Sequence, residues 1–166
     1  FDPPIKVGEM RQLSHRDDLL VVTSGISTEE AMRARSALEN VGVAVRHLHL
    51  NTIKPFNAEA LLDQLQSVKG GVITLENHVV TGGIGSLVSE TMTDAGIGKK
   101  LIRLGLKDTY AHGGSKAYLM RYYGLDALAL VQAVDELLGE PTGVTEENLD
   151  AVRVDAVHSN AKSEAL

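Results

Sequence analysis

One stretch of the chain, GVITLENHVVTGGIGSLVSETMTDAG (71–96), passes from a strand pattern through a glycine-rich turn into a helix pattern. Its first part, GVITLE (71–76), is an apolar run with the length of a strand that is buried on both faces. Three glycines follow within four positions, Gly82, Gly83 and Gly85. The helix is predicted to stop at Gly96, and its apolar face, spaced by three and four residues, consists of Ile84, Leu87, Val88, Thr91, Met92 and Ala95.

The same alternation of strand and helix patterns extends along the chain in both directions. Further strands are predicted at 7–13, 19–25, 43–50 and 100–106. Further helices are predicted after Ser27, Asn57, Ser115 and Asp126, which can each cap a helix start, and Glu30 would complete a capping box with Ser27. The alternation predicts an α/β fold, an open and mainly parallel sheet with helices on both faces. A ligand of such a sheet commonly lies at the carboxyl ends of the strands.

Composition narrows the class of protein. The 166 residues suffice for one domain with a proper core, and the net charge of −6 argues against nucleic acid or an anionic membrane as partner. The sequence contains no cysteine, which excludes disulfides, a thiolate nucleophile and a Cys-based zinc site. No apolar run approaches the length of a membrane span, and we expect a cytoplasmic location. The first residue is Phe rather than Met, so we expect a piece of a longer product or a processed chain.

Three motifs resemble a known family. TIKPFN (52–57), ENHVVTGGIGS (76–86) and GLKDTYAHGGSKAYLMRYYGLD (105–126) resemble, in this order, the C-terminal domain of transketolases. Deoxyxylulose-phosphate synthase and the β subunits of 2-oxo-acid dehydrogenases share that domain. The ENH form is most similar to the split transketolases that are made from two polypeptides. The resemblance, over roughly residues 7–139, implies a three-layer α/β/α sandwich on a five-stranded mixed sheet, with the first strand antiparallel to the other four.

The resemblance also implies where the chemistry of the whole enzyme lies. Transketolases transfer a two-carbon ketol unit between sugar phosphates. They hold thiamine diphosphate and Mg²⁺ through a GDG…N motif in one domain, while a glutamate in a second domain activates the cofactor. This sequence has no GDG…N motif, and its 166 residues leave no room for either of those two cofactor-binding domains. It also departs from the family in having His112-Gly113-Gly114-Ser115 where the family often has His-Gly-Ser. We therefore expect a non-catalytic domain that binds no cofactor or metal itself. It would pack against the pyrimidine-binding and diphosphate-binding domains and support the homodimer of the assembled enzyme.

Other interpretations of the chain stay open. Residues 1–139 are expected to form the domain, and residues 140–166 an extension with one short helix at Thr145 and then a disordered segment. The chain could instead be an independent α/β module that binds an anionic metabolite at the Gly82–Ser86 helix end. A third possibility is the C-terminal domain of a 2-oxo-acid dehydrogenase β subunit, which would contact an acyltransferase partner.

The glycine-rich turn admits two interpretations. Free N–H groups and the helix dipole at Gly83–Ser86 would attract a phosphate or carboxylate. Alternatively, the glycines let helix, strand and a neighbouring chain approach closely and allow positive φ in the turn. The spacing matches neither a P-loop nor the dinucleotide fingerprint, which favours packing or an interface. The candidate anion or interface site comprises Glu76, His78, Gly82, Gly83, Gly85, Ser86, His112 and Ser115.

The histidines raise separate questions. Glu76 and His78 are two apart on a strand, where they could transfer protons or simply fix the turn, and the lack of a nearby nucleophile or cofactor motif favours the structural role. His47 and His49 share a strand face, but no third ligand completes a metal site.

The run His112–Ser115 is predicted to turn the chain into a short helix. Ser115 would be its N-cap, and the lack of any G-x-S-x-G motif excludes a serine-hydrolase interpretation. Tyr118, Tyr122 and Tyr123 fall close together on this helix. We expect them to be packing or interface rings, and an exposed cluster would mark a partner surface.

Overall fold

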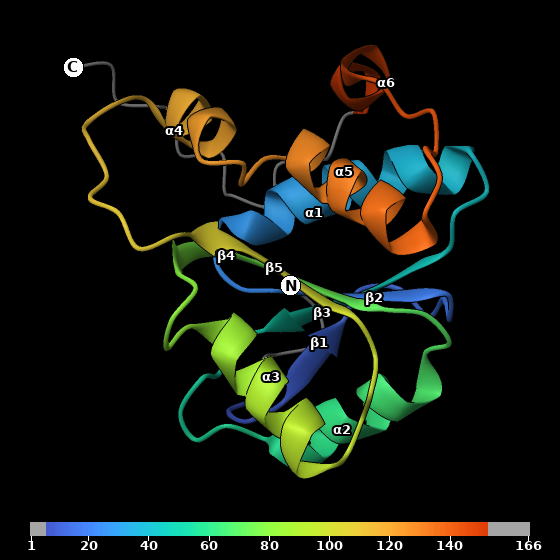
Figure 1. Cartoon of the computed structure of the whole chain (residues 1–166), viewed down its shortest axis with the longest axis vertical. Coiled ribbons are helices and arrows are strands. Elements are labelled where there is room, and N and C mark those ends of the chain that lie inside the picture. The colour runs from blue at the N-terminus through green and yellow to red at the C-terminus, as the bar shows by residue number, and fades with distance from the viewer. Residues whose placement is uncertain (1–5, 153–166) are drawn as a thin grey trace.

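The computed structural model describes residues 6–152 and shows a five-stranded sheet between two layers of helices (Figure 1). Strands and helices alternate over most of the chain, as the hydrophobic pattern predicts. The elements are β1 (Met10–Gln12), β2 (Leu19–Thr23), α1 (Ser27–Asn40), β3 (Val45–Leu50), α2 (Ala58–Ser67), β4 (Val72–Val79), α3 (Ile84–Asp94), β5 (Leu101–Leu106), α4 (Lys116–Tyr122), α5 (Ala127–Leu138) and α6 (Glu146–Ala151).

The strand order is β1-β3-β2-β4-β5. β1 is antiparallel to β3, whereas β2, β3, β4 and β5 are parallel to one another. This confirms the expected three-layer α/β fold with an antiparallel first strand. The connection after β2 leads to β3 on one side of the sheet, and the connection after β4 leads to β5 on the other side. The carboxyl ends of these two neighbouring parallel strands therefore flank the place where such sheets commonly bind ligands.

The helices separate into two layers, each with its own apolar core. Side chains alternate between the faces of the central strands, as they do in any strand. In β2, Leu19 and Val21 face α1 and α5, whereas Leu20 and Val22 face α2 and α3. In Figure 1, α1, α5 and α6 lie above the sheet, α2 and α3 lie below it, and α4 follows a long loop from β5.

The predicted N-caps hold at three helices and fail at one. The side chains of Asn57, Ser115 and Asp126 each accept a hydrogen bond from a backbone N–H of the helix that they precede. Ser27 does not cap α1, because it lies inside the helix, and its buried hydroxyl has no hydrogen-bond partner among residues 6–152. The Glu30 carboxylate instead accepts from Ala127 N at 3.0 Å, so the expected capping box is replaced by a tertiary bond to the start of α5.

The C-terminal part of the described chain packs on the α1/α5 layer. α6 follows Thr145, whose side chain and that of Asn148 form a capping box. Val144 and Leu149 are buried in the same core as α1 and α5. The division of the chain at residue 139 stays a prediction, and the segment expected to be disordered at its end lies outside the described residues. In the described part, every helix is too short or too polar to cross a membrane.

Candidate functional site

The glycine-rich turn is built around a buried carboxylate. Glu76, near the end of β4, is only 2% exposed. Its two oxygens accept hydrogen bonds from Ile84 N at 2.7 Å and Gly85 N at 2.9 Å, the first two residues of α3. A carboxylate at a helix N-terminus is favoured by the free N–H groups and by the helix dipole. The chain thus supplies its own anion, and these two N–H groups are not free for a diphosphate or another external anion.

The glycines leave room for this arrangement. A Cβ on Gly83 would overlap the Glu76 carboxylate, with the Cδ atom only 2.6 Å away. A Cβ on Gly85 would approach Arg103 Cδ at 2.9 Å and Thr74 Oγ1 at 3.0 Å. Gly82 has φ of 78°, a conformation that other residues adopt only with strain. Close packing therefore accounts for two of the three glycines, and turn geometry for the third.

Ser86 closes the turn, whereas His78 lies outside it. The Ser86 hydroxyl accepts from Gly82 N at 2.9 Å and donates to Val80 O at 3.0 Å. His78 is exposed, and its Nδ1 lies 2.7 Å from the Val79 carbonyl oxygen. No hydrogen bond or ion pair joins Glu76 to His78 in the described chain, so the structure does not bring them together as a proton-transfer pair.

Of the other predicted site residues, His112 belongs to an exposed aromatic cluster around α4, and Ser115 is the N-cap of that helix. The His112 ring lies between tyrosines: its Nδ1 is 3.0 Å from Tyr123 Oη and its Nε2 is 3.3 Å from Tyr118 Oη. It also meets Tyr122 edge to face, with ring centroids 4.9 Å apart. Tyr118 is 50% exposed and Tyr122 is 62% exposed. We call His112, Tyr118, Tyr122 and Tyr123 the α4 aromatic cluster.

An apolar hollow of about 230 Å³ lies between this cluster and the carboxyl ends of β4 and β5. Asn77 from β4, Leu106 from β5 and Ile26 from the β2–α1 turn contribute to its lining, together with Tyr123 and other residues of the 111–125 segment. No sequence motif pointed to Asn77 or Ile26 as residues of a site. Both residues lie where β2 and β4 end at the centre of the sheet, which is where such sheets commonly bind ligands. Predicting them would therefore have required knowledge of the strand order.

A chain of hydrogen bonds joins the two strand histidines between the sheet and α1. His47 Nε2 lies 2.8 Å from Thr23 Oγ1, which lies 2.9 Å from Thr28 Oγ1, and that hydroxyl is 2.8 Å from His49 Nδ1. Burial, helped by the charges of Arg35 and His49, lowers the pKa of His47 to about 3, so its imidazole is neutral at physiological pH. Burial also lowers the pKa of His49. Among residues 6–152, no three His, Cys, Asp or Glu side chains gather as a metal site.

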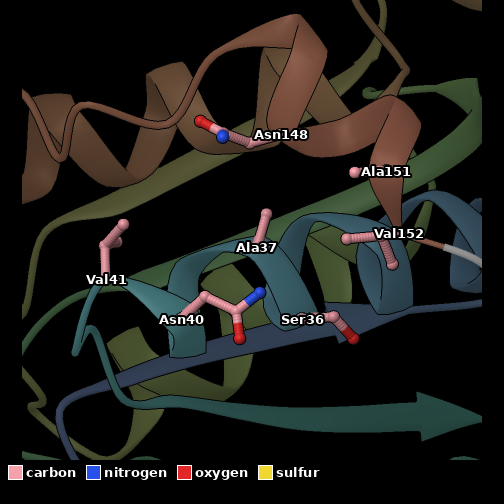
Figure 2. A pocket seen from close by; sticks show the side chains of 7 residues that line it. All are labelled: Ser36, Ala37, Asn40, Val41, Asn148, Ala151 and Val152. Carbon is pink, nitrogen blue, oxygen red and sulfur yellow. The ribbon is translucent and has the colours of Figure 1, made fainter.

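A second hollow, of about 400 Å³, separates the C-terminal half of α1 from α6 (Figure 2). Ser36, Ala37 and Asn40 line it on the α1 side, and Asn148 and Val152 on the other. Its polar groups are uncharged serine and asparagine side chains, so it contains no group that would act as a general acid or base.

These features define the class of the protein as an α/β domain with a mixed five-stranded sheet. Its Glu76 carboxylate occupies the N-terminus of α3, and its α4 aromatic cluster is exposed. The family described as "Transketolase, C-terminal domain" matches residues 8–130, and the chain belongs to it.

Individual relatives agree with this family. A protein of Methanocaldococcus jannaschii, provisionally named a transketolase C-terminal section, is 31% identical over 131 residues, which are 79% of this chain and 40% of the relative. The 6-deoxy-6-sulfo-D-fructose transketolase subunit SqwH of Clostridium sp. is 32% identical over 131 residues, with the same two coverages. A solved structure titled "Split gene transketolase, inactive beta4 tetramer" is similar with a TM-score of 0.73 and 30% identity, over 83% of this chain and 44% of that one. The chain thus spans less than half the length of these relatives.

Proposed function

We propose that this chain is the C-terminal, non-catalytic section of a thiamine-diphosphate-dependent transketolase, and that it supports assembly of that enzyme. The whole enzyme would transfer a two-carbon ketol unit between sugar phosphates in the cytoplasm as a homodimer. Thiamine diphosphate and Mg²⁺ would be held by the diphosphate-binding and pyrimidine-binding domains. Membership of the family supports a place in such an enzyme. The chain matches only about 40% of the length of two relatives, which supports its being one section of a longer enzyme.

The α4 aromatic cluster is the observation that carries the assembly role. Tyr118 and Tyr122 stand half or more exposed beside an apolar hollow at the carboxyl edge of the sheet. Tyrosines of this kind dominate binding energy in protein interfaces, since they bury large apolar area and keep a hydroxyl for a polar partner. A partner domain on this edge would cover rings that residues 6–152 leave exposed.

The contacts of Glu76 favour this proposal over an independent module that binds an anionic metabolite. The N–H groups of residues 84 and 85 already hold an internal carboxylate, so an external anion would have to displace a buried side chain. In the proposed enzyme, the glycine-rich turn has a packing role, and the cofactor lies outside residues 6–152.

The experiment combines the full chain with the cofactor-binding section of its enzyme. Calorimetry on the chain alone is expected to show no binding of thiamine diphosphate with Mg²⁺, whereas the mixed sections should form a complex and transfer ketol units. The double variant Tyr118→Ser/Tyr122→Ser should weaken that complex at least about tenfold, because truncated interface tyrosines are often hot spots. Leu138→Ser, which alters an exposed apolar residue on α5, is the matched control. Cofactor binding by the isolated chain, or normal assembly of the tyrosine variant, would contradict the proposal.

A further inference from the structure

An apolar groove of about 430 Å³ runs between α2 and α3. These helices form the layer of the sandwich opposite to α4 (Figure 1). Phe56, Leu62 and Leu87 lie in the groove and remain partly accessible to solvent. The two helices have 10 and 11 residues, so the groove can be about 15 Å long, or three helical turns.

The rim of this groove is acidic. Glu59 from α2 and Glu90 and Asp94 from α3 are exposed along it, and Asp63 lies one turn beyond Glu59 on α2. Neither helix contains a lysine or arginine. Within the part of the chain that the structure describes, none of these four carboxylates makes a hydrogen bond or an ion pair. The α2/α3 groove therefore has an apolar base, and the carboxylates along its rim have no cationic partner among the described residues.

These charges are placed unfavourably for the free chain. Glu59 and Asp63 are four residues apart on α2, as are Glu90 and Asp94 on α3, and like charges at this spacing repel one another. Asp94 is also the last residue of α3, where the helix dipole disfavours a negative side chain. A cationic partner would relieve both effects.

We propose that the α2/α3 groove binds a basic amphipathic helix of another polypeptide. Two apolar side chains at i and i+4 would enter between Leu62 and Leu87, as in other complexes where a helix lies in a groove. Lysines or arginines on both flanks would meet the carboxylates of the rim and steer the approach. This inference does not rest on the proposed function, since the groove and the α4 aromatic cluster lie on opposite layers.

The test uses two synthetic helical peptides of about twelve residues, a length that matches three turns. Both carry leucines at i and i+4, one has flanking lysines, and the other has glutamates at the same positions. Fluorescence anisotropy with the full chain should show the lysine peptide binding at least about tenfold more tightly than the glutamate peptide. Its affinity should fall as salt screens the charges.

Variants separate the groove from general charge attraction. The double variant Glu90→Lys/Asp94→Lys should weaken the lysine peptide roughly tenfold and strengthen the glutamate peptide. Glu140→Lys/Glu147→Lys makes the same change of net charge at exposed sites away from the groove and should leave both affinities unchanged. Circular dichroism verifies that all variants fold. Equal binding of the two peptides to the unmodified chain, or equal effects of the two double variants, would overturn the inference.

Discussion

Replacing Glu76 with alanine tests whether the glycine-rich turn depends on an internal carboxylate. Hydrogen bonds to a charged group contribute about 1.5–3 kcal/mol each, and Glu76 accepts from Ile84 N and Gly85 N. Both N–H groups would be left without a partner, since the carboxylate is 2% exposed and water does not readily replace it. We expect Glu76→Ala to lower the free energy of unfolding by roughly 3–5 kcal/mol. That is a large part of the stability of a typical domain.

The assay is urea unfolding of the full chain followed by circular dichroism. Glu76→Gln should lose about half as much as Glu76→Ala, because one amide oxygen can still accept while the NH₂ group faces the second N–H. Glu140→Ala is the control, because it removes an exposed carboxylate that makes no hydrogen bond or ion pair within residues 6–152. It should change the free energy of unfolding by less than about 0.5 kcal/mol. A loss below about 1 kcal/mol for Glu76→Ala would refute the reasoning.

The same variant decides between the two interpretations of the turn. Removing the side chain frees the N–H groups at the start of α3, so added acetate or phosphate should bind there and stabilise Glu76→Ala by mass action. The unmodified chain should gain no comparable stability. If the unmodified chain gains as much as the variant, the turn is an external anion site and the packing interpretation is wrong.

Three further predictions concern single residues. Gly83→Ala should destabilise the fold by about 2 kcal/mol or more in urea unfolding, because its Cβ would overlap Glu76, whereas Gly98→Ala has open space and should not. The pKa of His47 is about 3 in the folded chain and near 6.5 when unfolded, so the unfolded chain binds the proton first and stability falls as pH drops below 6.5. By pH 5 this loss should reach about 2 kcal/mol, and His47→Asn should have a flatter pH profile. Lys99→Met should lower the melting temperature by a few degrees, since the Lys99 ammonium donates to the Leu65 and Val68 carbonyls at the end of α2, about 1–2 kcal/mol in all.

Local signals explain how much of this fold is predictable from sequence. The strands follow from apolar runs, and the caps Asn57, Ser115 and Asp126 follow from hydrogen bonds that reach only three residues along the chain. Ser27 and Glu30 carry the same local pattern, yet Glu30 bonds to Ala127, 97 residues away. A tertiary partner overrides a local motif, and residue spacing contains no information about it.

The candidate site shows the same limit. The sequence pattern identified Glu76 and the glycines as candidate site residues. Their packing role depends on the Glu76 carboxylate accepting a hydrogen bond from the start of α3, eight residues later in the chain. The groove between α2 and α3 was not predictable at all, because it forms only when two helices separated by β4 pack side by side. Periodicity identifies the buried face of each helix, whereas the shape between two outer faces depends on how they pack.

The first turn of α1 holds both helices that lie next to the α4 aromatic cluster. Glu29 pairs with Lys116 of α4 at 2.7 Å, and its neighbour Glu30 bonds to the start of α5. Two consecutive side chains thus tether both helices that flank the 123–126 connection. A partner that binds at the α4 aromatic cluster would therefore contact helices that are already joined to α1, and shifting either helix would break a contact with the first turn of α1.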